Sequence, residues 1–156
     1  MASSTLLLAL GNDIMGDDAA ALVAAKCVKD QGVKDVDVSD TIEAGLALLE
    51  ILSPYKQVLL LDTIVTGNHP PGTVLELFKK DFTKVLGSSP HYAGLPEVIE
   101  LSQQLAIPFP GDIRVLALEI EMPTDFSETL SPLIQAAIPG YVKKAIAILE
   151  GWQGVG

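Results

Sequence analysis

The fold is decided by residues 6–23, LLLALGNDIMGDDAAALV. A continuous apolar run, residues 6–10, stops at Gly11, and a second glycine, Gly16, precedes two carboxylates and an alanine-rich segment. An apolar run of this length and continuity is typical of a strand buried on both faces. Glycine permits backbone angles that a side chain would forbid. The stretch therefore predicts a strand, a loop and a helix, with any chemistry collected in the loop.

Two adjacent carboxylates, Asp17 and Asp18, stand where the helix is expected to begin. Acidic residues suit the cap and the first turn of a helix, and this structural explanation stays open. A nucleotide site is disfavoured, because the spacing of Gly11 and Gly16 matches neither the dinucleotide fingerprint nor a phosphate loop. No lysine follows, and the two carboxylates would repel a phosphate. We therefore expect this loop to bind a cation.

Length and charge limit the classes of protein that the chain can belong to. Its 156 residues, 49% of them hydrophobic, predict a single domain over residues 1–156 with a substantial core. The 20 acidic and 10 basic residues give a net charge of −10, which argues against nucleic acid as a partner. The single cysteine, Cys27, excludes an internal disulfide and a multi-cysteine metal site, and we interpret it as a buried small hydrophobe.

The first residues and the hydrophobic runs bear on membranes. Residues 1–4 carry no basic side chain, and the apolar run that follows them is too short for a signal peptide. The chain has no stretch of roughly 18 to 20 apolar residues that could span a bilayer. We therefore expect a cytoplasmic protein with no membrane partner.

The rest of the chain alternates between strand and helix patterns. Helices are expected over about 18–30, 44–52, 94–105 and 131–152, and further strands over about 33–38, 58–61, 73–78 and 113–118. The strand at 73–78 is expected to return antiparallel beside its predecessor. Pro139 and Gly140 should kink or divide the last helix. This order predicts an α/β three-layer sandwich, with a five-stranded, mostly parallel twisted sheet, one antiparallel strand and helices on both faces.

Three side chains are expected to meet at one edge of this sheet. Ligands of open parallel sheets bind at the carboxyl ends of the strands. Asp18 follows the first strand, Asp62 closes the third, and residues 79–90 are long enough to bring His91 back to that edge. Two carboxylates and an imidazole can form an open site for a divalent metal. The structural alternatives are an Asp62 bonded to loop amides and a His91 on a surface loop, while His69 is interpreted as an exposed loop residue.

Four motifs can be compared with known families. They are Gly11-Asn12-x-x-x-Gly16-Asp17-Asp18, Leu60-Leu61-Asp62, Ser88-Ser89-Pro90-His91-x-x-Gly94-Leu95 and Leu130-Ser131-Pro132. Together they resemble the maturation endopeptidases of nickel–iron hydrogenases, and the resemblance covers most of the chain. It implies that Asp18, Asp62 and His91 contact the metal and form the catalytic site. The residues expected to bind the substrate are Gly11, Asn12, Asp17 and Glu43.

The resemblance also implies a substrate and a metal. The expected partner is the large-subunit precursor of a hydrogenase, which loses a C-terminal peptide once nickel is inserted. Nickel is expected from this substrate, with zinc or cadmium as substitutes in the isolated protein. We expect the protein to be a monomer or a weak homo-oligomer. The chain departs from the family at Ala19 and Ala21, where glycine is frequent, and at Ile42-Glu43, where Gly-Gly-Thr is frequent. These changes leave the three metal positions intact and affect how the substrate tail lies against the first helix.

Three functional hypotheses remain open. In the first, the chain is an endopeptidase, and Asp18, Asp62 and His91 either activate water for peptide hydrolysis or only recognise nickel. In the second, the chain is a non-catalytic nickel-sensing or chaperone-like module with the same metal site. In the third, it is an α/β small-molecule binder whose acidic loop is only a cap. A Ser-His-Asp or Cys-His set is disfavoured, because the only histidines are His69 and His91.

Overall fold

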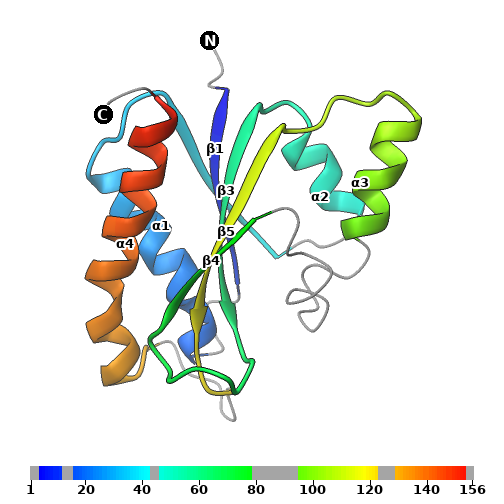
Figure 1. Cartoon of the computed structure of the whole chain (residues 1–156). Helices are drawn as coiled ribbons and strands as arrows, with labels where there is room; N and C mark the ends of the chain where they lie inside the picture. The colour runs from blue at the N-terminus through cyan, green and yellow to red at the C-terminus, as the bar shows by residue number, and fades with distance from the viewer. Residues whose placement is uncertain (1–3, 12–15, 43–45, 79–94, 123–128, 154–156) are drawn as a thin grey trace.

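Strand β1 (Thr5–Leu10) lies inside a five-stranded sheet, and all six of its residues are buried. The computed structural model describes residues 4–11, 16–42, 46–78, 95–122 and 129–153. The other strands are β2 (Val36–Thr41), β3 (Gln57–Ile64), β4 (Val74–Phe78) and β5 (Asp112–Glu119). The spatial order is β2-β1-β3-β5-β4, and only the pair β4–β5 is antiparallel among these strands (Figure 1). The mostly parallel sheet that the sequence predicts is therefore confirmed.

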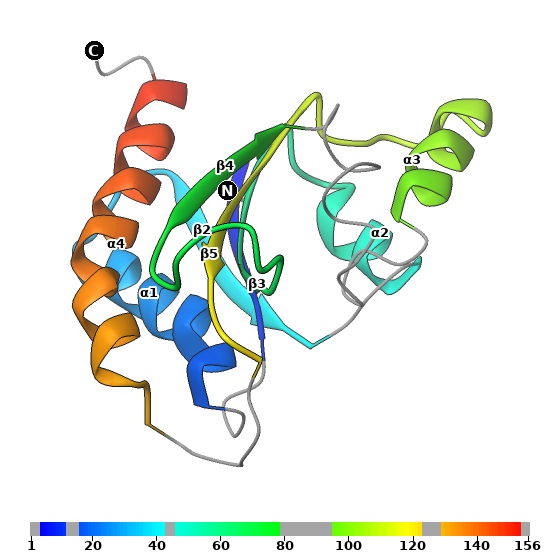
Figure 2. The same cartoon turned by 60° about the horizontal axis from the view of Figure 1, so that its bottom comes forward.

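Helices cover both faces of the sheet. They are α1 (Ala20–Asp30), α2 (Leu46–Leu52), α3 (Leu95–Gln104) and α4 (Pro132–Trp152). Helices α1 and α4 lie on one face, and α2 and α3 lie on the other (Figures 1 and 2). Because side chains alternate along a strand, Leu59 and Leu61 join the core under α1 and α4, while Val58 and Leu60 join the opposite core. The result is the predicted three-layer sandwich.

The fourth strand does not lie where the sequence analysis expects it. Strand β4 pairs with β5 and not with its predecessor β3, and β5 takes the position between them. The reason is burial, because most of β5 is buried, whereas β4 is largely half-buried or exposed. The more apolar strand therefore occupies the interior of the sheet, and the alternating strand forms its edge.

The last helix is not divided. Helix α4 continues through Pro139 over all of its 21 residues. Proline lacks the N–H that would bond to the carbonyl of Gln135, but both residues are exposed, so water can reach that carbonyl. The helix is therefore not divided at Pro139, and α4 spans the sheet as one element.

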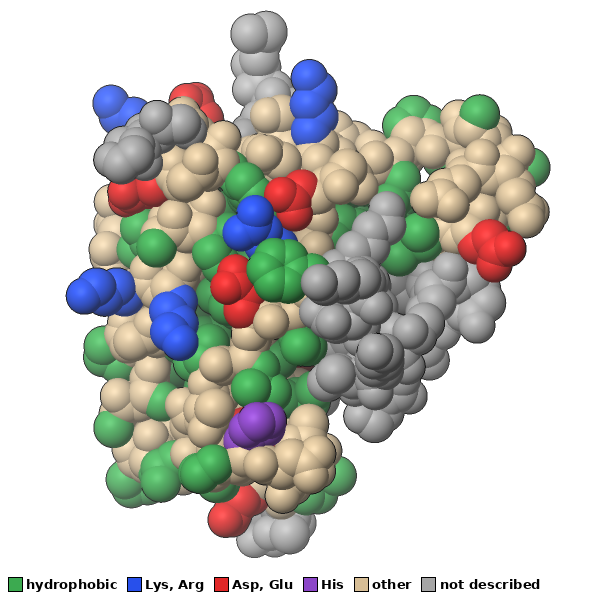
Figure 3. Space-filling view, viewed as in Figure 1, with side chains coloured by type: hydrophobic (Ala, Val, Ile, Leu, Met, Phe, Trp, Pro, Cys, Tyr) green, Lys and Arg blue, Asp and Glu red, His purple; other side chains and the backbone are tan. Residues whose placement is uncertain are grey.

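The surface carries charges of both signs. On the face shown in Figure 3, lysine and arginine side chains are interspersed with acidic ones. The charge on this face is therefore mixed and not of one sign.

Within the described residues, no helix combines the length and the apolar character that crossing a membrane requires.

Candidate active site

The candidate site lies at the carboxyl ends of the adjacent strands β1 and β3. From these two strands the chain continues toward opposite edges of the sheet, to β2 and to β4. Strand β1 connects through α1 to β2, whereas β2 connects through α2, on the other face, to β3. Pairing between β1 and β3 ends at Ala9 and Leu61, while β3 continues beside β5 as far as Ile64. Such a switch point opens a crevice at the carboxyl ends of the strands, and this is where α/β sheets bind ligands. Figure 2 turns this edge toward the viewer.

Asp18 lies beside the crevice in a 3-10 turn, η1 (Gly16–Ala19), that precedes α1. Gly16 enters this turn with a positive φ of 57°. A side chain on Gly11 could not be accommodated, because a Cβ there would lie 2.5 Å from the backbone oxygen of Asp18. The two glycines of the first motif therefore let the turn lie against the end of β1.

Neither of the two carboxylates caps α1, although both lie in the first turn of η1, which leads into this helix. The residue at the N-cap position of α1 is Ala19, which has no side-chain bond to the helix. The helix begins two residues later than Asp18, because the chain first forms the 3-10 turn. Both acidic side chains are thus available for contacts with distant parts of the chain.

Asp62 lies within β3 and does not close it, because pairing with β5 extends the strand to Ile64. Its exposed fraction is 1%. The backbone N–H of Thr63 donates to Asp62 Oδ1 over 2.7 Å, and the Thr63 hydroxyl donates to Asp18 Oδ1, also over 2.7 Å. Thr63 therefore links two of the three predicted metal residues, because it bonds to its neighbour Asp62 and to Asp18 of η1.

Tyr141 fixes the backbone at Asp62 from helix α4. Its buried hydroxyl lies 2.7 Å from the carbonyl oxygen of Leu116 and 3.1 Å from that of Asp62, and it donates toward both. Burial raises the pKa of Tyr141 well above its usual value, and the charge of Asp62 raises this pKa further. Tyr141 is therefore a neutral donor that ties α4 to two strands.

Asp17 forms a clasp with the start of α4. The backbone N–H of Ser131 donates to Asp17 Oδ1 over 2.7 Å, and the Ser131 hydroxyl donates to Oδ2 over 2.8 Å. A carboxylate is favourable at this place because the N-terminus of a helix carries partial positive charge. The structure thus gives Asp17 a structural task, and its contact with the substrate stays a prediction.

Glu119 is a buried carboxylate that the sequence analysis does not assign. It accepts hydrogen bonds from the backbone N–H of Thr66 at 2.8 Å, from the Thr66 hydroxyl, and from the N–H of Gly67 at 3.3 Å. Its own backbone N–H donates to Thr73 at 2.8 Å. Glu119 therefore holds both ends of the connection between β3 and β4. An acidic residue directly after an apolar run was the signal in the sequence.

The remaining predicted residues are placed only in part. His91, Asn12 and Glu43 lie outside the described residues, and His69 is exposed. Gly11 lines a hollow of about 390 Å³ at the carboxyl ends of β1 and β2. Its other lining residues are Leu22, Asp40, Thr41 and Ile42. This hollow adjoins the turn that carries Asp18.

Two carboxylates fit a divalent cation, since hard oxygen donors suit such ions. Within the ranges that the structure describes, no group of three potential ligands is found. The third predicted donor, His91, is outside these ranges. Asp18 and Asp62 could therefore supply two oxygen ligands to such an ion.

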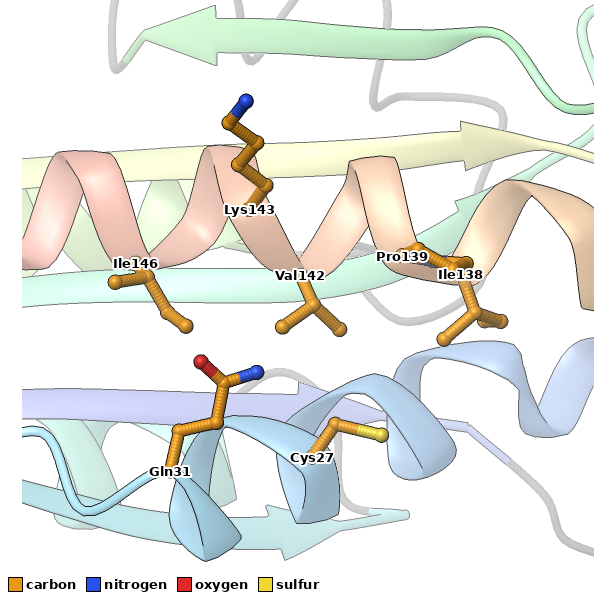
Figure 4. Close-up of a pocket in the computed structure, with 7 residues that line it drawn as sticks. All are labelled: Cys27, Gln31, Ile138, Pro139, Val142, Lys143 and Ile146. Carbon is orange, nitrogen blue, oxygen red and sulfur yellow. The ribbon is translucent and has the colours of Figure 1, made fainter.

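A second hollow lies between α1 and α4, away from the sheet. It measures about 410 Å³ and is lined by Cys27, Gln31, Ile138, Pro139, Val142, Lys143 and Ile146. In Figure 4 Cys27 and Gln31 face Val142 and Ile146 across it. Cys27 is partly buried there, and Lys143 is the single charged residue of the lining. The lining is apolar and lacks the acidic groups of the crevice.

Comparisons with known proteins agree with this fold. The hydrogenase maturation protease family model matches residues 22–148. The chain is 26% identical over 153 residues to the hydrogenase expression/formation protein HoxM of Cupriavidus necator, covering 95% of this chain and 75% of HoxM. It is 24% identical over 152 residues to the hydrogenase 2 maturation protease of Escherichia coli, covering 93% and 90%.

Solved structures show the same fold. The hydrogenase maturating endopeptidase HybD from E. coli superposes with a TM-score of 0.80 at 24% identity, covering 94% of this chain and 92% of HybD. Because the family model matches most of its length, this chain belongs to the hydrogenase maturation protease family.

Proposed function

We propose that this protein removes a C-terminal peptide from the nickel-loaded large-subunit precursor of a nickel–iron hydrogenase. The observation that carries the proposal is the meeting of Asp18 and Asp62, through Thr63, at the switch point of a chain that belongs to the maturation proteases. His91 is the third residue of the proposed site. One relative is named for hydrogenase expression and formation and the other for hydrogenase 2 maturation, which supports a hydrogenase precursor as the substrate.

The two carboxylates recognise the nickel of the precursor. Two negatively charged carboxylates attract a divalent cation, and the bonds from Thr63 keep both side chains in place before the substrate arrives. Nickel held there brings the peptide that follows the metal site of the precursor to the same edge of the sheet. Cleavage adds water across the peptide bond, so the C–N bond breaks and a new carboxyl and a new amine are released.

The hollow beside Gly11 suits the substrate tail. It lies next to the turn of Asp18, and its lining includes the exposed Ile42, directly before the predicted substrate residue Glu43. Without a side chain, Gly11 leaves room for the turn of Asp18 to lie against the end of β1. The tail of the precursor therefore lies across the ends of β1 and β2 in the proposed complex.

The test compares precursor with and without nickel. A nickel-loaded precursor should be shortened by one discrete C-terminal peptide, as measured by intact mass, while nickel-free precursor stays whole. A protein can select one state of its substrate only by binding it better than the other. Asp18→Ala and His91→Ala should lower processing by at least about 100-fold without loss of cooperative unfolding.

The matched control is His69→Ala, because His69 is exposed in the connection between β3 and β4 and is not part of the proposed site. This variant should cut the loaded precursor as the wild type does. A correctly paired, nickel-loaded precursor that emerged uncut would contradict the protease. It would instead support a non-catalytic module that binds metal with the same residues.

A further inference from the structure

Thr63 is a buried polar residue near the end of strand β3. It follows Asp62 in β3, and its exposed fraction is 7%. Burying a hydroxyl costs free energy unless it forms a hydrogen bond, so its partner indicates why it is there. That partner is Asp18, which is 45 positions away in the sequence.

The two bonds of Thr63 converge on the two acidic residues of the candidate site. Its hydroxyl donates to Oδ1 of Asp18 and its backbone N–H donates to Oδ1 of Asp62, each over 2.7 Å. Bonds from neutral donors to a carboxylate are among the stronger hydrogen bonds in proteins. Each bond occupies one oxygen atom of its acceptor, so both carboxylates are fixed relative to the same residue.

From this geometry we propose that Thr63 is a positioning residue that sets the separation of the Asp18 and Asp62 carboxylates for a divalent cation. The inference rests on the proposed function, in which these two side chains bind the metal. Two like charges repel each other, and without a common donor Asp18 would be free to turn away. Holding the pair in place before the cation binds removes the cost of ordering them at that moment.

Threonine is better suited to this task than serine. Its branched Cβ restricts χ1, so the hydroxyl is directed at Asp18 with little loss of side-chain entropy. Valine has nearly the same shape but lacks the hydroxyl, and it leaves the backbone N–H to Asp62 intact. Replacement by valine therefore removes one of the two bonds, and replacement by serine keeps both.

The experiment measures Zn²⁺ binding by calorimetry on the full chain, together with the thermal midpoint of unfolding. Thr63→Val should weaken Zn²⁺ binding by about 10-fold or more, the size found when outer-shell partners of metal ligands are removed. Thr63→Ser should stay within about 3-fold of the wild type, because the hydroxyl is kept. On nickel-loaded precursor, Thr63→Val should raise KM more than it lowers kcat.

A matched control is available in the same part of the chain. The Thr66 hydroxyl also donates to a carboxylate, that of the buried Glu119, outside the proposed site. Thr66→Val should lower the thermal midpoint about as much as Thr63→Val does, but it should leave Zn²⁺ binding within about 2-fold. This comparison separates positioning of the metal ligands from a general loss of stability.

The outcomes distinguish the two proposals. If Asp18→Ala abolishes Zn²⁺ binding while Thr63→Val binds Zn²⁺ like the wild type, the role of Thr63 is wrong and the proposed site stands. Equal weakening by Thr66→Val and Thr63→Val would also overturn the positioning role. If Asp18→Ala binds Zn²⁺ unchanged, the metal site itself is wrong and the inference fails with it.

Discussion

The helices on the two faces of the sheet differ in length and in what they hold. Helices α1 and α4 have 11 and 21 residues and contact each other and β3, whereas α2 and α3 have 7 and 10 residues. The Asp17 clasp leads to the start of α4, and the donor to the Asp62 carbonyl, Tyr141, belongs to α4. The layer of α1 and α4 therefore braces the described part of the candidate site, and the other layer can vary with less effect on it.

The strongest test of this difference uses two neighbouring leucines of β3. Leu60 and Leu61 are both fully buried, but they point to opposite faces. Replacement of a buried leucine by alanine costs about 2–5 kcal/mol, depending on how far the surroundings collapse into the cavity. We expect the cost of Leu61→Ala to lie near the upper end of this range, because α1 and α4 brace each other. The cost of Leu60→Ala should lie near the lower end. Urea unfolding of both variants measures this, and equal costs would remove the distinction between the faces.

The next effect concerns the hydroxyl of Tyr141. Tyr141→Phe should lower the free energy of unfolding by about 1–2 kcal/mol, because two buried carbonyls lose their donor. In the folded protein the pKa of Tyr141 is raised above its usual value, so the neutral form is favoured. The wild type should therefore lose stability as the pH rises above about 10, where only the unfolded chain readily releases this proton. The phenylalanine variant lacks this part of the alkaline loss.

Tyr55→Phe is the control for that measurement. Tyr55 packs against the opposite core and donates to Asp37 Oδ2 over 2.8 Å, but it is only partly buried. Its replacement should cost about 0.5 kcal/mol or less, since water can satisfy the remaining groups. A Tyr55 variant as unstable as the Tyr141 variant would contradict the bracing role of α4.

A smaller effect is expected at the clasp between Asp17 and Ser131. Asp17→Ala removes both bonds at the start of α4 and should cost about 1 kcal/mol, the usual value for a lost helix cap. Ser131→Ala removes only the hydroxyl bond and should cost about half as much. Thermal unfolding of both variants measures the difference. A larger loss for the serine variant would show that Ser131 has another partner.

The smallest effect is expected at Leu105, directly after α3. This leucine is 60% exposed. Leu105→Gln should change the free energy of unfolding by no more than about 0.5 kcal/mol, because this exposed side chain loses little water-accessible area on folding. Chemical denaturation provides the measurement. A loss of several times this size would mean that the α2 and α3 layer is as tightly held as the other.

The sequence predicts the layers of this fold well because each is a local pattern. The run at residues 6–10 is continuous because β1 is buried on both faces, and the alternation at 73–78 reflects an edge strand. What the pattern cannot predict is which strand lies beside β4, since this depends on competition between β3 and β5 for burial. The continuity of α4 through Pro139 depends on exposure, which periodicity does not report.

The site could be predicted only as far as topology dictates it. Asp18 and Asp62 were expected at one edge because parallel strands end together, and their bonds to Thr63 show how closely they are tied. The donors were missed because they are distant in the sequence, with Thr63 45 positions from Asp18 and Ser131 114 positions from Asp17. The hydroxyl of Thr63 was a visible signal, since it directly follows Asp62 at the end of an apolar run.

The clasp between Asp17 and Ser131 also sets the order in which the site can form during translation. The ribosome releases β1, η1 and β3 long before residue 131, so the nascent chain exposes Asp17 without the partner that lies at the start of α4. Tyr141 reaches the Asp62 carbonyl only after a further 79 residues have followed Asp62. The braced site is thus completed as one of the last steps of synthesis, and a polysome carrying unfinished copies of this chain presents no assembled peptidase to its neighbours.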